Sequence, residues 1–131
     1  MNLTKHSKNN LLKSLAWCDV TKEYAEPIFN YLVHGYHPGS FWNSVFANDF
    51  MNAIGRSHPA NSIPELKKAV TWIVNDMPTE AYGSYDKVDA WLKLSSEARR
   101  SRLEKARLIY TEQDEIIMIL KDEPTTEPML F

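Results

Sequence analysis

Apolar residues recur every three or four positions through the middle of the chain, a spacing that predicts amphipathic helices. In residues 62–77 the apolar positions are Leu66, Ala69, Val70, Ile73, Val74 and Met77. Ser62 can cap the first turn, Pro64 is tolerated within that turn, and Pro78 ends the pattern. We therefore expect a helix across residues 62–77.

A second helix is predicted over residues 40–54, and we expect it to be central to the fold. Its apolar positions are Phe41, Val45, Phe46, Phe50, Ala53 and Ile54. Ser40 follows the turn residues Pro38 and Gly39, so its hydroxyl can accept hydrogen bonds from the free amides of the first turn. Asn48 and Asp49 fall in the middle of this helix, where neither residue has a good helix propensity.

Shorter patterns predict the remaining helices. Pro27 suits the first turn of a helix that ends near Gly35. Gly83 and Ser84 precede a helix whose inner face includes Val88 and Trp91, and a further helix should run from about residue 95 to 110. These elements predict an all-α fold, a compact bundle of four or five short helices with flexible N- and C-terminal segments. The core residues that we expect are Phe46, Phe50, Ile73 and Trp91.

Composition divides the chain into four stretches. Residues 1–20 form a Lys- and Asn-rich arm that docks at Trp17 or forms a short helix, and residues 21–94 form the helical core. Residues 95–120 are an additional helix or arm, and residues 121–131 are a flexible tail with two prolines. The apolar run 116–120 fits a helix or a strand, and we favour a helix or an extended arm because no partner strand is evident.

Overall composition is that of an ordinary globular domain. The 131 residues are 44% hydrophobic and 24% charged, and the net charge of −2 gives no general attraction to nucleic acid or anionic membranes. The sequence has no run of 18 apolar residues, and its first 20 residues lack the apolar core of a signal peptide. The lone Cys18 cannot form an internal disulfide, which suits a reducing cytoplasm. We expect neither a membrane span nor a nucleic-acid partner.

Several residues invite a catalytic or metal-binding interpretation, but no spacing supports one. His34 and His37 lie three apart across an expected helix end and turn, and no HExxH or Cys-rich pattern joins them to Asp49. Ser40 is not in a GxSxG elbow, and Cys18 lies beside an acidic residue that disfavours its thiolate. The glycine-rich phosphate loops are also absent from the sequence. We therefore expect a protein that is not an enzyme and that has no metal and no cofactor.

Polar residues between aromatics provide the best candidates for a recognition surface. On the expected central helix, Asn48 and Asp49 form a polar stripe with Asn43 and Asn52. This stripe is a solvated face, a set of side chains that bond a neighbouring loop, or a binding surface. Flat rings near this stripe would suit protein hot spots and nucleobase stacking alike. The aromatic residues that could supply them are Tyr36, Trp42 and Tyr82.

A charge reversal marks the last third of the chain. Residues 97–107 hold five basic and two acidic residues, whereas residues 112–131 hold six acidic residues and one lysine. This pattern suits a solvated helix face near an acidic segment, or a basic patch in which Arg99 and Arg102 bind a phosphate-bearing ligand. The full candidate set is His34, Tyr36, His37, Ser40, Trp42, Asn43, Asn48, Asp49, Tyr82, Arg99 and Arg102.

The order of short motifs in residues 34–91 resembles a family of small accessory proteins of tailed phages. The shared pattern is HGxxPGSFxxxVxxNDxxxA, followed by a proline and by GSxxxVxxW. The chain departs from it at Ser57-His58, where the family has Ala-Asp, and at Tyr82, where the family has Trp. The resemblance implies a phage origin and a non-virion role in the host cytoplasm, and it brings no catalytic residues.

Three hypotheses follow. The first is a non-enzymatic phage accessory protein that binds a host protein and counteracts host defence. The second is an oligomeric binder that sequesters a nucleotide-derived signalling molecule in an aromatic and arginine-lined pocket between protomers of a homo-oligomer. The third, an enzyme or a nucleic-acid-binding protein, has the least support because no motif favours it and the net charge opposes it. An apolar patch rimmed by charges would favour the first hypothesis.

Overall fold

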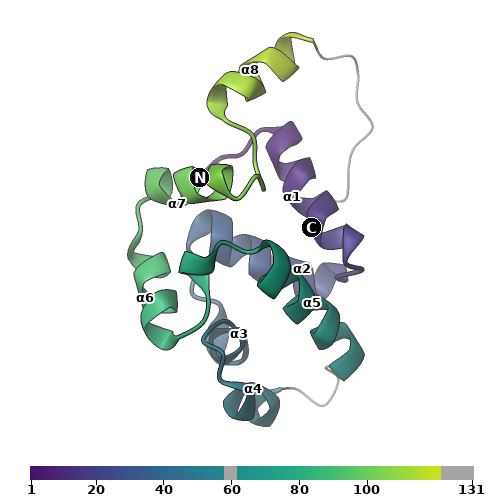
Figure 1. Cartoon of the computed structure of the whole chain (residues 1–131), viewed down its shortest axis with the longest axis vertical. Coiled ribbons are helices and arrows are strands. Elements are labelled where there is room, and N and C mark those ends of the chain that lie inside the picture. The colour runs from purple at the N-terminus through teal and green to yellow at the C-terminus, as the bar shows by residue number, and fades with distance from the viewer. Residues whose placement is uncertain (58–61, 122–131) are drawn as a thin grey trace.

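The computed structural model describes residues 1–57 and 62–121, and over these residues the chain is all-α (Figure 1). Within that part of the chain the α-helices are α1 (Lys5–Trp17), α2 (Lys22–Phe29), α3 (Gly39–Phe46), α4 (Phe50–Arg56), α5 (Ile63–Asp76), α6 (Tyr85–Lys93), α7 (Ser96–Lys105) and α8 (Glu112–Leu120). A π-helix, η1 (Asn30–His34), continues α2, and a 3₁₀-helix, η2 (Thr79–Ala81), precedes α6. The expected all-α class is confirmed, but four or five helices were too few.

Hydroxyl side chains start many of these helices, as the sequence indicated. Ser62, Ser84 and Ser95 each accept a hydrogen bond from the amide three residues further on, at the start of α5, α6 and α7. Thr111 caps α8 in the same way, and so the apolar run 116–120 is helical. The helix expected to reach residue 110 ends at Lys105, because Arg107 adopts a left-handed backbone with φ 59°.

The predicted helix over residues 40–54 is wrong, because the Asn48-Asp49 pair divides it into α3 and α4. Asn48 has a left-handed φ of 61°, which ends α3, and Asp49 then caps α4 by accepting a hydrogen bond from the Asn52 amide. The predicted cap at Ser40 is also wrong, since α3 begins at Gly39 without a side-chain cap. The new direction of α4 leaves Phe50 52% exposed, so its assignment to the core was wrong as well.

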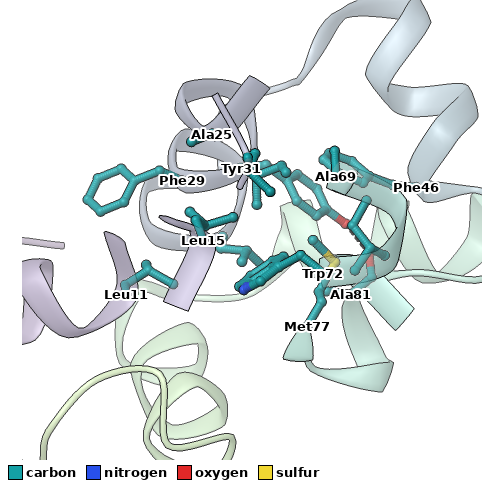
Figure 2. Packing of buried hydrophobic residues seen from close by; sticks show 14 of the residues in the cluster. Leu11, Leu15, Ala25, Phe29, Tyr31, Phe46, Ala69, Trp72, Met77 and Ala81 are labelled. Atoms are coloured by element: carbon teal, nitrogen blue, oxygen red, sulfur yellow. Dashed lines mark hydrogen bonds between the residues drawn. The ribbon is translucent and has the colours of Figure 1, made fainter. Parts of the chain in front are cut away.

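The core is built from α1, α2, η1, α3, α5, α6 and α7, and Tyr31 contributes a central ring to it (Figure 2). Its ring stacks on Phe46 with centroids 4.5 Å apart, and its hydroxyl donates a 2.7 Å hydrogen bond to the Ala81 carbonyl. Trp91 donates from its indole nitrogen to the Tyr31 carbonyl over 3.1 Å. Phe46 and Trp91 are fully buried and Ile73 is nearly so, which confirms these three core predictions.

The prediction of a flexible N-terminal segment is wrong, because this stretch forms helix α1, the short helix that was one of the two expectations for it. The other expectation, docking at Trp17, is wrong because Trp17 is 90% exposed. Leu11, Leu12 and Leu15 are fully buried on one face, and Ser14 accepts a 2.8 Å hydrogen bond from the Trp72 indole. A helix is stable here because tertiary burial supplies what its Lys- and Asn-rich composition lacks. The flexible tail predicted for residues 121–131 falls almost wholly outside the described residues.

Helix α8 is held to the rest of the chain by the buried carboxylate of Glu115. Ser7 donates to this carboxylate over 2.6 Å, and Thr4 and Arg100 also donate to it. Burial alone would raise the pKa of Glu115, but these hydrogen bonds outweigh it and hold the pKa below its ordinary value. A charged Glu115 therefore connects α8 to both α1 and α7.

Candidate protein-binding groove

Helices α4 and α5 enclose an apolar groove on the surface. It has a volume of about 380 Å³ and is lined by Phe50, Ile54, Ile63, Leu66, Lys67, Val70, Thr71 and Val74. Among its lining side chains Ile63 is 59% exposed and Val74 is 57% exposed. Lys67 is the one charged side chain in that lining. A contiguous apolar surface of this kind is typical of a site that another molecule covers.

The groove exists because α5 has apolar residues on two faces. Ala69 and Ile73 turn toward the core and are buried, whereas Ile63, Val70 and Val74 line the groove. Leu66 is buried at the boundary and belongs to both surfaces. On α4, Phe50 and Ile54 lie one turn apart and face the same groove.

A smaller cavity of about 190 Å³ continues the groove toward α6. Phe50, Val70 and Val74 line both cavities, and the smaller one adds Asn48 and Tyr82. Two of the predicted binding residues therefore lie at one end of the groove. Asn48 lies there at the break between α3 and α4, and Tyr82 comes from the segment after η2.

Asp49 stands beside this end of the groove as a fixed negative charge. Its carboxylate accepts a 2.6 Å hydrogen bond from the Tyr85 hydroxyl and a 2.7 Å hydrogen bond from the side-chain amide of Asn52. These two bonds, led by that from Tyr85, keep the pKa of Asp49 below its ordinary value. The carboxylate therefore remains ionised at neutral pH at the rim of an apolar surface.

His34, Tyr36 and His37 lie elsewhere and do not reach the groove. Tyr36 and His37 line a separate cavity of about 460 Å³ next to Glu23 and Glu26. The His34 ring stacks on Tyr36 at 5.1 Å, and burial, followed by nearby positive charges, lowers its pKa. His34 is therefore neutral at neutral pH.

The histidines and Cys18 were considered for a metal or nucleophilic site, although no spacing in the sequence supported one. Across residues 1–57 and 62–121, no group of three His, Cys, Asp or Glu side chains could hold a metal ion, and His58 lies outside this range. Burial, followed by the carboxylates of Asp76 and Asp19, raises the pKa of the Cys18 thiol. Cys18 is therefore largely a protonated thiol at neutral pH.

The predicted aromatic platform is not assembled. Trp42 is only 9% exposed, since its ring packs at 5.6 Å from Phe46 and 5.7 Å from Tyr24. It belongs to the core and does not join Tyr36 and Tyr82 in one surface. Its neighbours Ser40 and Asn43 lie on α3, exposed and half-buried respectively, and neither lines the groove.

Arg99 and Arg102 are committed to contacts within the chain. Arg99 is 7% exposed, and its guanidinium donates to the carbonyls of Leu94 and Val33 over 2.6 Å and 3.3 Å. Arg102 donates to the Ala98 carbonyl and lies 3.8 Å from the Glu80 carboxylate. Neither guanidinium presents a free fork to a phosphate group.

The groove residues themselves were missed from the sequence. Val70 and Val74 were grouped with the buried positions in one apolar stripe, Phe50 was assigned to the core, and Ile63 was not singled out. The available signal was that the apolar positions of residues 63–77 cover more than one helix face. No sequence pattern pointed to Tyr85, which bonds to Asp49, because the two residues are 36 positions apart and are brought together only by the tertiary structure.

No protein-family model, curated protein or solved structure matches this chain. In the part of the chain that the structure describes, no helix is both long enough and apolar enough to cross a membrane. The geometry of the groove is therefore the main guide to function.

Proposed function

We propose that this chain is a non-enzymatic phage accessory protein that binds a host protein through the groove between α4 and α5. The observation that carries the proposal is the exposure of Phe50, Ile54, Ile63 and Val74 around one apolar hollow. Leaving this surface in water is unfavourable, and a partner that covers it gains roughly 25 cal/mol for each Å² of apolar area buried.

The polar residues around the groove favour specific binding of one partner over nonspecific hydrophobic association. Asp49 is held by Tyr85 at one end of the groove, and Lys67 lies along its side. Charges of both signs around an apolar centre are typical of protein interfaces, where the rim sets orientation and the centre supplies the binding energy.

The phage context rests on the resemblance carried by residues 34–91. A phage protein of this kind acts in the host cytoplasm, and we propose that its host target belongs to a defence system. The resemblance brings no catalytic residues, which agrees with a function based on binding alone.

The second hypothesis, an oligomer that sequesters a nucleotide-derived signal, has less support. It required arginines and aromatic rings around one cavity. Arg99 and Arg102 are instead held by carbonyls and Glu80, and Trp42 is in the core.

The test is capture of the host partner by groove variants. The full chain is expressed with an affinity tag in the bacterial host, a co-purifying protein is identified, and the complex is reconstituted from purified components. Val74→Glu and Ile54→Glu place a charge in the groove at exposed positions. We expect each to weaken binding of the purified partner at least tenfold, because the charge must lose its water when the groove is covered.

Met51→Glu is the matched control, since Met51 is 89% exposed on α4 and does not line the groove. It should bind like the unsubstituted chain. Partner binding that survives both groove substitutions would refute the groove as the docking site. Turnover of the captured protein or of a small molecule would refute the non-enzymatic role.

A further inference from the structure

A further cavity lies where residues 1–8 meet the end of α2 and η1. It has a volume of about 320 Å³, and it shares no lining residue with the α4/α5 groove. Its apolar lining includes Leu3, Phe29 and Val33, and its polar lining consists of Asn2, Lys8 and His34. An apolar hollow with a few convergent polar groups is the usual form of a small-molecule site.

His34 reaches this cavity from the end of the π-helix. η1 stops at His34, because Gly35 follows in a left-handed backbone with φ 66°. Turns of π-helix are rare and occur frequently at functional sites. The imidazole stacks on Tyr36, and neither of its nitrogens makes a hydrogen bond within residues 1–57 and 62–121. A neutral imidazole therefore offers one donor and one acceptor to a molecule in the cavity.

Lys8 brings a positive charge to the same cavity. Its ammonium lies over the ring of Phe29, 5.7 Å from the centroid, and pairs with no carboxylate in the part of the chain that the structure describes. The face of a ring attracts an ammonium but accepts no conventional hydrogen bonds from it. The N–H donors of Lys8 are therefore available to an anion.

Arg99 places a second positive charge behind the cavity wall. Its guanidinium donates to the carbonyl of Val33, which lines the cavity, and an added Cβ at Gly35 would lie 2.6 Å from it. Its two hydrogen bonds go to the neutral carbonyls of Val33 and Leu94, and no carboxylate among the described residues pairs with it. A buried charge without a counter-ion is unfavourable. An anion in the cavity would offset this charge without touching the guanidinium.

The electrostatic environment of His34 agrees with a site for an anion. Burial is the largest cause of its lowered pKa, and the charges that add to it are all positive, namely the amino group of Met1, Arg99 and Lys8. No acidic side chain is among the described residues that line the cavity. The cavity is thus locally positive in a chain whose net charge is −2.

We propose that this cavity binds a small organic anion, a phosphate or carboxylate group joined to an apolar body. Lys8 pairs with the anionic group and the imidazole of His34 donates a hydrogen bond to it, while the apolar body lies against Phe29. Arg99 attracts the anion through the wall that Val33 forms. This binding site goes beyond the proposed function of the groove and does not depend on it.

NMR titration of the full chain with three small probes tests the proposal. Phenyl phosphate and benzoate share a ring and differ in their anionic group, and benzyl alcohol carries the ring without a charge. We expect saturable binding of an anion, with chemical-shift changes at His34 and Phe29, and clearly weaker binding of benzyl alcohol. Tighter binding of phenyl phosphate would assign the site to phosphate compounds, and tighter binding of benzoate would assign it to carboxylates. The absence of saturable binding by either anion, or equal binding of benzyl alcohol, would overturn the proposal.

Lys8→Met tests the role of the ammonium, because it keeps a long side chain over Phe29 and removes the charge. It should weaken binding of the preferred anion by about tenfold or more, since a hydrogen bond to a charged group is lost. Lys13→Met is the matched control, because Lys13 lies on the same helix, is exposed and does not line the cavity. It should bind the anion like the unsubstituted chain. An equal loss in both variants would show a general effect of surface charge and would overturn the proposal.

His34 gives a readout that a purely structural cavity would not change. A nearby anion favours the protonated imidazole, so the pKa of His34 should rise by about 1 or more when the cavity is saturated. His34→Phe keeps a ring against Tyr36 and removes the donor, and it should weaken binding of the same anion. A pKa of His34 that does not change on saturation, or a His34→Phe variant that binds the anion unchanged, would overturn the proposal.

Discussion

The Tyr85 hydroxyl donates a 2.6 Å hydrogen bond to the Asp49 carboxylate, which joins α6 to the first turn of α4 beside the apolar groove. The bond is exposed to solvent, and so its contribution to stability is small, since water competes for both groups. Its structural effect is to fix the position of a charge at the groove rim.

Asp49→Ala should therefore change partner binding more than it changes folding. We expect weaker binding of the purified host partner, with only a modest fall in the midpoint of thermal unfolding from the loss of the α4 cap. Affinity by calorimetry and thermal unfolding by circular dichroism test this. Tyr85→Phe is the companion variant, because it keeps the carboxylate and removes only the bond that orients it. A loss of folding in Asp49→Ala comparable to that of Trp91→Ala would contradict the expectation.

Truncation of the aromatic core should be costly. Trp91→Ala and Phe46→Ala each remove a fully buried ring, and Trp91→Ala also removes the donor to the Tyr31 carbonyl. The free energy of unfolding should fall by about 3–5 kcal/mol in each case. Urea unfolding followed by circular dichroism measures it. Trp17→Ala is the control, because Trp17 is 90% exposed and its loss should change stability by less than about 0.5 kcal/mol.

Two glycines should respond to alanine in opposite directions. Gly35 has a φ of 66°, and an added Cβ would lie 2.6 Å from the Arg99 guanidinium, which is held by two carbonyls. Gly35→Ala should lower the free energy of unfolding by at least about 1–2 kcal/mol, since a left-handed backbone is unfavourable for alanine. Gly55 lies within α4 with open space around it, and Gly55→Ala should raise stability by roughly 0.5–1 kcal/mol. Chemical unfolding of the two variants measures both changes in the free energy of unfolding. Changes in the same direction would contradict this account.

Acid should weaken the attachment of α8. The pKa of Glu115 lies below its ordinary value of 4.5 in the folded chain, so the unfolded chain binds the proton more readily. The stability that Glu115 contributes is therefore complete above about pH 4.5 and is lost as the pH falls through the lower pKa of the folded chain.

The matched variant Glu115→Gln tests this pH dependence. At neutral pH it should reduce the free energy of unfolding by about 1.5–3 kcal/mol, because bonds to a charged acceptor are lost. The difference between the two chains should shrink as the pH is lowered below 4.5. A difference that stays constant down to the acid limit of folding would show that the charge of Glu115 is not what stabilises α8.

The sequence was sufficient to predict features that depend on residues only a few positions apart. The caps at Ser62, Ser84 and Ser95 depend on one hydroxyl and an amide three residues away. A cap was predicted at Ser62, and helix starts were predicted after Ser84 and near residue 95. The break at Asn48 was missed, although its poor helix propensity was noted, because the apolar spacing on either side continues across it. Here the left-handed backbone of Asn48 ends the helix, although the apolar spacing alone would have continued it.

The candidate site was predicted only in part, because a binding surface depends on which apolar faces the fold leaves uncovered. Asn48 and Tyr82 were expected and line one end of the groove. Val74 was grouped with the buried Ile73 in one apolar stripe, since periodicity cannot tell an apolar side chain that is buried from one that is exposed. Arg99 was expected either on a solvated helix face or as a ligand for phosphate, whereas the fold buries it and directs it to two carbonyls.

The contact between the first and last described helices also constrains the time at which the chain can complete its fold. Ser7 and Glu115 are separated by 108 positions, and Thr4 and Glu115 by 111. At a synthesis rate of about 5–20 residues per second, α1 leaves the ribosome roughly 5–20 seconds before its partner on α8. Throughout that interval, the hydroxyl groups of Thr4 and Ser7 cannot bond to Glu115 and are left to water.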